Sequence, residues 1–148
     1  MQAILSKPYS VVMQGYEENS NNDESADRYI PGVCNIGKDE IEQRKKGIYF
    51  ALALLVAVII VLQLLKANPI WRIIVFIPAA SFAVSFQQWY FKFCLGFGLK
   101  GIFNFGEVGK FINVEQKEYY KKDKAKAIKM IIYGIIYGLL VAVVYCFL

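Results

Sequence analysis

The feature that most constrains this chain is a set of three uncharged apolar runs, at residues 47–65, 73–91 and 130–148. Each run holds about 19 residues, and a helix of that length rises about 28 Å, which matches the hydrocarbon core of one bilayer. The composition agrees, because 57% of the 148 residues are hydrophobic, more than in an ordinary soluble domain. The sequence therefore predicts an all-α membrane protein with three transmembrane helices.

The predicted membrane domain covers residues 47–148, with helices at about 47–65, 70–91 and 129–148. Only a short turn separates the first two helices, so they are expected to form an antiparallel hairpin, to which the third helix is added. The segment 92–128 is expected to be cytoplasmic or to lie at the membrane interface. Its second half is rich in charged residues and good helix formers, which predicts a cytoplasmic helix running into the third span.

The region before the first span divides into two parts. Residues 1–30 are predicted to be a disordered cytoplasmic tail, because the polar stretch 17–24 has too few apolar side chains to offset the entropy of ordering. The apolar block Ala3–Leu5 is too short for a signal peptide, so no cleavage is expected. Residues 31–46 are predicted to hold an entry helix that starts near Lys38 and continues into the membrane.

The basic residues are distributed unevenly around the three runs. Six precede the first run, nine lie between the second and third, and none follows the third. The positive-inside rule then places the amino terminus inside and the carboxyl terminus outside a cytoplasmic (inner) membrane. Because the net charge of +5 is concentrated beside the spans, anionic lipid headgroups are the expected partner. Nucleic-acid binding is not expected, since contact with the lipid surface is a sufficient role for these lysines.

The most specific local pattern lies just before the first span and consists of Asn35, Gly37, Glu40 and Arg44, the entry-helix motif. Either Asn35 or Gly37 is suited to be the helix N-cap. Glu40 lies in the first turn, where the helix dipole favours an anion, and its i, i+4 spacing to Arg44 favours a salt bridge. The motif therefore predicts a capped, charged helix that enters the membrane from the cytoplasm.

The spacing N-x-G-x-x-[D/E]-x-x-x-R of this motif resembles the opening of a small bacterial inner-membrane domain of unknown function. That domain is a two-helix hairpin that occurs alone or fused to rhodanese, a sulfur transferase. The resemblance covers residues 34–101 at most, with Gly47 one position before a glycine of the family. The chain differs from the family in its third helix, and it has Phe93-Cys94-Leu95-Gly96 where the family has a Cys-Pro pair.

Two of the three cysteines, Cys34 and Cys94, are predicted to face the cytoplasm at the mouth of the hairpin. They are interpreted first as structural thiols, and the alternatives are a redox pair, a carrier of persulfide sulfur, or two ligands of a metal site. No metal site is predicted, because a closed zinc site needs four ligands and the chain has no histidine. No cofactor is predicted, since the G-x-G-x-x-G pattern at 96–101 follows a membrane helix instead of a strand.

Small and polar residues in the second and third runs indicate where helices pack. Gly134 and Gly138 form a small-xxx-small face, whose partner is either a helix of the same chain or another protein molecule, including a second copy. Pro78 is expected to kink the second helix, because it removes one backbone hydrogen bond. Gln87 and Gln88 are either hydrogen-bonded between helices or hydrated near the headgroups, and hydration is the prediction.

The segment 102–112 alternates aromatic residues, glycines and charged residues without a long helical period. Two arrangements fit it. It lies flat in the headgroup layer with Phe103, Phe105 and Phe111 inserted, or it folds back against the helical hairpin.

The sequence holds no recognisable catalytic constellation, and the predicted function follows from that. We expect a non-catalytic membrane accessory or interaction protein that binds lipid and a partner, either a second copy or another membrane protein. The alternative is a cysteine-based carrier of sulfur or electrons that uses Cys34 and Cys94. A transporter or pore ranks last, because no charged residue lies in the middle of any apolar run.

Overall fold

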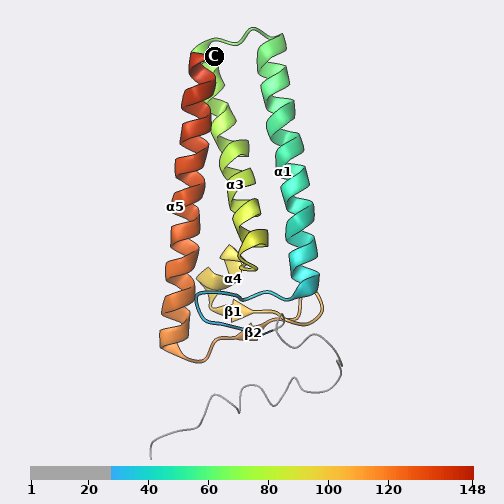
Figure 1. Ribbon diagram of the computed structural model, residues 1–148, viewed down its shortest axis with the longest axis vertical. Coiled ribbons are helices and arrows are strands. Elements are labelled where there is room, and N and C mark those ends of the chain that lie inside the picture. The colour runs from blue at the N-terminus through green and yellow to red at the C-terminus, as the bar shows by residue number, and fades with distance from the viewer. Residues whose placement is uncertain (1–27) are drawn as a thin grey trace, which may run out of the picture.

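Residues 28–148 are described by the computed structural model shown in Figure 1. Its elements, in chain order, are α1 (Lys38–Leu64), α2 (Pro69–Arg72), a 3-10 turn η1 (Ile73–Val75), α3 (Phe76–Tyr90), α4 (Leu95–Lys100), β1 (Ile102–Phe103), β2 (Ile112–Asn113) and α5 (Lys117–Phe147). The predicted disordered tail, residues 1–30, lies outside the described residues except for positions 28–30.

Three helical segments are long and apolar enough to cross a membrane: Lys38–Leu64, Pro69–Tyr90 and Lys117–Phe147. The prediction of three membrane-length helices is therefore confirmed for the described part of the chain. Figure 1 shows α1 and α5 on either side of α3, which packs against both of them. The short turn after α1 makes α1 and α3 antiparallel, as the sequence predicts.

Helix α1 is one uninterrupted helix that joins the predicted entry helix to the first span. It begins at Lys38 with Gly37 as its N-cap, and acidic residues occupy its first turn. Beyond its other end, Lys66 has a left-handed backbone (φ 47°), and the N–H of Ala67 donates to the Leu62 carbonyl at 3.0 Å. This hydrogen bond closes the end of the helix and turns the chain toward α2.

The second span is irregular, because α2, η1 and α3 follow one another without a connecting loop. Pro78 explains the irregularity. It has no N–H to donate to the Ile74 carbonyl, and its ring crowds that carbonyl. The 3-10 turn Ile73–Val75 contains Ile74, so the predicted effect of Pro78 appears as this turn.

The bundle has an apolar core near the end where α1 turns into α2. It is formed by Leu55, Val75, Ala79 and Tyr145. The Tyr145 hydroxyl also donates to the Ile59 carbonyl at 3.3 Å, which joins α5 to α1. Close packing and interhelical hydrogen bonds of this kind are what hold helices together in lipid.

The glycine face of α5 packs against α3 of the same chain. A Cβ placed on Gly134 would lie 2.5 Å from Val84 Cγ2, and one placed on Gly138 would lie 2.8 Å from Ala80 Cβ and 2.9 Å from the Phe76 carbonyl oxygen. Both glycines are buried. Of the two partners that the sequence left open, the structure therefore shows the intramolecular one.

Below the helices, the chain forms a small structured cap that we call the polar end, comprising residues 28–37, residues 91–116 and the first turns of α5 (Figure 1). Strands β1 and β2 pair antiparallel, with Phe103 opposite Ile112, and an isolated parallel bridge joins Ile36 to Asn104. The segment 102–112 thus folds back against the bundle. Insertion of Phe103 into the headgroup layer is wrong, because this side chain is only 9% exposed.

Candidate functional site

The buried side chain of Asn35 joins the segment before α1 to the end of α3. Its Oδ1 accepts the Cys94 N–H at 2.6 Å, and its Nδ2 donates to the Cys94 carbonyl at 3.1 Å. Its backbone N–H donates to the Lys92 carbonyl at 3.2 Å. The side chain therefore replaces, for residue 94, the pair of hydrogen bonds that a neighbouring strand would supply.

Asn104 continues this network toward α1. Its N–H donates to the Asn35 carbonyl at 3.0 Å, and its carbonyl accepts the Gly37 N–H at 2.7 Å. Its Nδ2 donates to Glu40 Oε1 at 3.2 Å, and Glu40 Oε2 accepts Arg44 Nη2 at 3.1 Å. All four residues of the entry-helix motif thus belong to one hydrogen-bonded network that is completed by Asn104.

Gly37 has its place in this network for a steric reason. A Cβ at this position would lie 2.9 Å from the Phe105 Cα and 3.1 Å from the Phe105 carbonyl oxygen. Both are backbone atoms, which cannot move aside as a flexible side chain can. Any larger residue would therefore push the hairpin away from the start of α1.

Asp123 holds the other end of the cap. It is fully buried on α5, where its Oδ1 accepts the Gly32 N–H at 2.6 Å and its Oδ2 accepts the Tyr29 hydroxyl at 2.8 Å. The Tyr29 ring stacks on Phe103 with 4.4 Å between centroids. Burial, reinforced by the hydrogen bond to Asp123, raises the pKa of the Tyr29 hydroxyl above its usual range.

Sequence reasoning missed both Asp123 and Asn104. Asp123 stands between Lys122 and Lys124, so the pattern indicated a solvated, charged helix. Asn104 lies in a glycine-rich stretch with no helical period. The partners of Asp123, and the Glu40 partner of Asn104, are distant in sequence, and no local signal identifies such pairs.

Gln87 is a further correction to the sequence analysis. The sequence favoured hydration for this side chain, yet its Nε2 donates to the Met130 carbonyl of α5 at 3.2 Å and to the Ala83 carbonyl at 3.2 Å. The Oε1 of Gln88 accepts the Leu95 N–H at 3.3 Å. Both amides therefore bond to protein: Gln87 joins α3 to a carbonyl within α5, and Gln88 accepts an N–H just beyond the end of α3.

The cysteines of the polar end are buried and form no disulfide. Cys34 is 8% exposed and Cys94 is 4% exposed. The Sγ of Cys34 lies 3.7 Å from the Ile36 carbonyl oxygen, to which it donates. Asn35 holds the segment that contains Cys34 against Cys94. A thiol that carries sulfur must also be accessible as a thiolate, and both thiols are buried. Cys146 lies at the opposite end, where its Sγ donates to the Pro69 carbonyl at 3.5 Å.

Metal binding finds no support in the acidic and sulfur-bearing residues. Within residues 28–148, no group of three or more histidine, cysteine, aspartate or glutamate side chains is arranged to hold a metal ion. The buried carboxylates of Glu40 and Asp123 accept hydrogen bonds from protein groups instead. These polar groups therefore hold the cap together.

An exposed apolar surface lies on the hairpin of the cap. We call it the hairpin patch, and it consists of Val108, Phe111 and Ile112, which are 47%, 60% and 44% exposed. The turn that carries it is well braced. Asn104 Nδ2 donates to the Glu107 carbonyl at 3.0 Å, and the Lys110 N–H donates to the same carbonyl at 3.1 Å. The patch is therefore presented in a fixed geometry.

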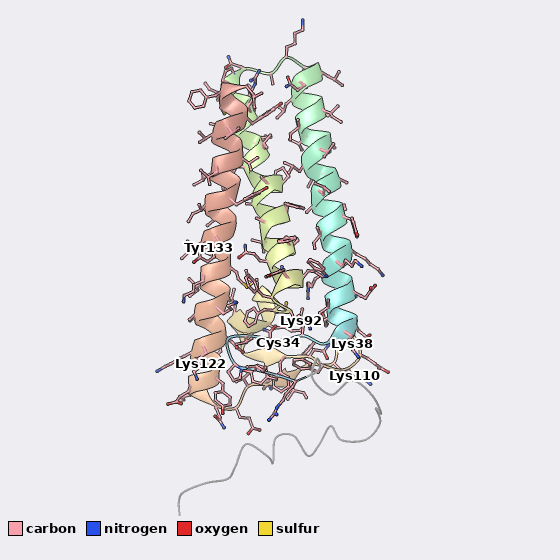
Figure 2. The ribbon with its side chains drawn as sticks, in the orientation of Figure 1. Cys34, Lys38, Lys92, Lys110, Lys122 and Tyr133 are labelled. Carbon is pink, nitrogen blue, oxygen red and sulfur yellow. The ribbon has the colours of Figure 1, made fainter. Side chains whose placement is uncertain are left out.

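Basic side chains surround this end of the molecule. Figure 2 labels Lys38, Lys92, Lys110 and Lys122 at the polar end, well below Tyr133 in the apolar part of α5. Lys110 pairs with Glu107 at 2.8 Å, and both side chains are largely exposed. The polar end thus combines a positive surface with exposed apolar side chains, among them those of the hairpin patch.

Comparisons of the chain with protein families, with curated proteins and with solved structures gave no match. The resemblance carried by the entry-helix motif remains a prediction.

Proposed function

We propose that this chain is a three-helix membrane protein without catalysis of its own, whose polar end lies in the cytoplasm and binds another protein through the hairpin patch. The observation that carries the proposal is the exposure of Val108, Phe111 and Ile112 on a braced turn. Exposed apolar patches on ordered elements are characteristic of interaction sites for proteins or membranes.

The proposed membrane boundary follows from helix lengths. A hydrocarbon core of about 30 Å takes about 20 helical residues. Counted from the end of the bundle where α1 turns into α2, this length reaches Lys45 in α1, Gln88 in α3 and Ile128 in α5. Basic or polar residues begin at the same level in all three helices, which supports a common boundary there.

The depth of the hairpin patch favours a protein partner over lipid. Helix α5 starts at Lys117, about 11 residues before Ile128, so its beginning lies roughly 17 Å beyond the hydrocarbon core. The headgroup layer is only about 5–8 Å thick on each side. Strand β2 directly precedes α5 and lies at the far end of the cap in Figure 1. Lipid therefore does not reach Phe111, and a protein surface is the proposed cover.

The cytoplasmic orientation rests on charge. Most of the lysines and arginines among residues 28–148 lie at the polar end or next to it in α1 and α5, whereas the opposite end carries Lys66 and Arg72. The positive-inside rule retains such a basic end in the cytoplasm. Reporters fused to the two termini test this, with cytoplasmic activity expected at Met1 and external activity after Leu148.

The partner site is tested by a photoreactive amino acid placed at position 111 in the full chain in native membranes. We expect a discrete protein adduct that disappears when Val108 is also changed to Ser. The matched control position is 133, because Tyr133 is 62% exposed within the apolar part of α5 and should give lipid adducts. Lipid adducts alone at position 111 would show that the hairpin lies in the membrane and would overturn the proposal.

The cysteine carrier remains the second candidate. The hydrogen bonds between Asn35 and Cys94 favour it, because they bring the segment next to Cys34 against Cys94. Exposure disfavours it, since both thiols are buried. A carrier would need the cap to open, and a disulfide-trapping experiment described in the Discussion distinguishes the two functions.

A further inference from the structure

We propose that the end of α3 and the adjoining side of α5 form a binding site for the phosphate of an anionic phospholipid headgroup. The site, which we call the lysine site, consists of Lys126, which lies on the ring of Phe91, with Lys129 one turn further along α5 and Lys92 next to Phe91 in the chain. It rests on the proposed insertion of the bundle in a membrane, but it is independent of the partner proposed for the hairpin patch.

The relative position of α3 and α5 at this site is fixed by three contacts. Lys126 Nζ lies 3.9 Å from the centroid of the Phe91 ring. Phe93 is fully buried and belongs to one apolar cluster with Ala127 and Met130. The hydrogen bond from α3 to the Met130 carbonyl lies at the same level. Phe91 and Phe93, the two neighbours of Lys92 in the chain, therefore both contact residues 126–130 of α5.

The spacing along α5 places a third cation on the same side. Lys129 follows Lys126 by three residues, and residues at i and i+3 lie on one face of a helix. Lys92 and Lys129 are exposed, and Lys126 is half-buried where it packs on Phe91. One ammonium group, that of Lys126, therefore lies on the Phe91 ring, and Lys92 and Lys129 add two exposed cations close to it along the chain.

Lys92 has an unusual backbone conformation for a lysine. Its φ is +49°, in the left-handed region, and the N–H of Phe93 donates to the Gln88 carbonyl at 3.0 Å. Glycine is the residue favoured at this position of a helix end. Lys66 has the same conformation at the end of α1, on the opposite side of the bundle, and so provides a natural control for the conformation itself.

Within residues 28–148, no acidic side chain is paired with the lysine site, and none of its lysines forms a salt bridge. The nearest acid along α5, Asp123, is buried and accepts hydrogen bonds from Gly32 and Tyr29. Glu118 lies further along α5, one helical turn from Lys122. An anion bound among the three ammonium groups would relieve their mutual repulsion.

The level and the chemistry of the site favour a lipid over a soluble anion. Lys126 lies just outside Ile128, where the hydrocarbon core is proposed to end, and Lys129 lies one residue inside it, from where its long side chain extends to the lipid phosphates beyond the boundary. Tyr90 and Phe91 meet edge to face at 5.1 Å and are 64% and 38% exposed. Aromatic rings at this depth contact the glycerol and upper acyl region of a lipid, while the lysines contact its phosphate.

The test compares full-length protein in phosphatidylcholine vesicles with and without phosphatidylglycerol, using lipid retention by native mass spectrometry. The site variant combines Lys92→Gln, Lys126→Gln and Lys129→Gln. The control variant removes the same charge from the other side of α5 with Lys117→Gln, Lys121→Gln and Lys124→Gln. We expect the site variant to lose about tenfold or more in phosphatidylglycerol preference, and the control to keep most of it. Lys66→Gln should keep all of it.

Equal loss in the two triple variants would show diffuse attraction to the bilayer and would overturn the site. Displacement of the lipid by inorganic phosphate at constant ionic strength would reassign it to a soluble anion. Thermal unfolding in phosphatidylcholine alone verifies that the variants fold. Photo-crosslinking at position 111 is repeated in the site variant, to separate this proposal from that of the hairpin patch. If the two sites are independent, the site variant loses its lipid preference but keeps the protein adduct.

Discussion

The membrane-length bundle and the polar end below it are held together by different kinds of contact. In the bundle, α3 and α5 approach closely at Gly134 and Gly138, and a single tyrosine hydroxyl joins α5 to α1. In the polar end, the buried side chains of Asn35, Asn104 and Asp123 bond to backbone groups or to other side chains that are 59 to 94 positions away in sequence.

This difference follows from the two solvents. Lipid is as apolar as a leucine side chain, so helices in it associate through close packing and not through the hydrophobic effect. The backbone of the cap is largely irregular, so it must satisfy its donors and acceptors with side chains. The two regions should therefore fail under different substitutions, and each prediction below tests that independence.

The largest effect is expected from changing both Gly134 and Gly138 to Leu. Each new side chain would overlap atoms of α3, and overpacking of this kind costs about 1–3 kcal/mol per site. We expect a clear loss of thermal stability in mild detergent. The volume-preserving pair Ile135→Leu with Leu139→Ile should have little effect. If the two pairs behaved alike, α3 and α5 would not pack through the glycine face.

Asp123→Ala should destabilise the cap by about 3 kcal/mol. The change leaves the Gly32 N–H and the Tyr29 hydroxyl without their acceptor, and hydrogen bonds to a charged group are each worth about 1.5–3 kcal/mol. We expect faster proteolysis within residues 28–37, measured in micelles. Lys121→Ala, on the exposed side of the same helix, is the control. Unchanged protection of this segment would contradict the assigned role of Asp123.

The same contrast between bundle and cap separates what the sequence could predict from what it could not. The spans follow from composition, since a long uncharged run beside a bilayer has only helix available to it. Pro78 likewise marks the irregular turn through local chemistry. The entry-helix motif was recognisable as the most specific pattern of the chain, although local reasoning assigned it to capping and charge pairing.

The cap itself was not predictable, because its contacts are long-range. Strands of two residues have no period, so β1 and β2 leave no signal in the sequence. Asp123 resembles one more charge on a solvated helix until Gly32 and Tyr29 are placed beside it. Gln87 was assigned to hydration from its position near the headgroups, and nothing local indicates its acceptor, the Met130 carbonyl, which is 43 positions away.

A smaller effect is expected from Tyr29→Phe, and it depends on pH. At neutral pH the loss of the hydrogen bond to Asp123 should cost about 1 kcal/mol. The pKa of Tyr29 is raised in the folded protein, so its contribution to stability is present below the usual tyrosine pKa of about 10 and is lost as the pH rises above it.

The stability of the wild-type protein should therefore fall toward that of Tyr29→Phe between about pH 10 and pH 11, because only the unfolded wild-type chain releases this proton there. Urea unfolding at several pH values measures the difference. A gap between the two proteins that stayed constant above about pH 10 would mean that Tyr29 is not held protonated by its surroundings.

The smallest effect is expected from the cysteines. Cys34→Ser and Cys94→Ser should leave membrane abundance and helix content unchanged, because the hydrogen bonds of residue 94 to Asn35 come from its backbone and not from its thiol. The reverse test is mild oxidation of the wild-type protein in membranes, followed by non-reducing electrophoresis after labelling of free thiols. Buried thiols should remain reduced and unlabelled until the protein is denatured. A Cys34–Cys94 disulfide that forms readily, and is lost in either variant, would show that the cap opens and would move the cysteine carrier ahead of the interaction protein.

The Asp123→Ala variant sharpens this test. If the cap is what shields the thiols, loosening the segment next to Cys34 should increase its labelling, while the glycine-pair variant should leave it unchanged.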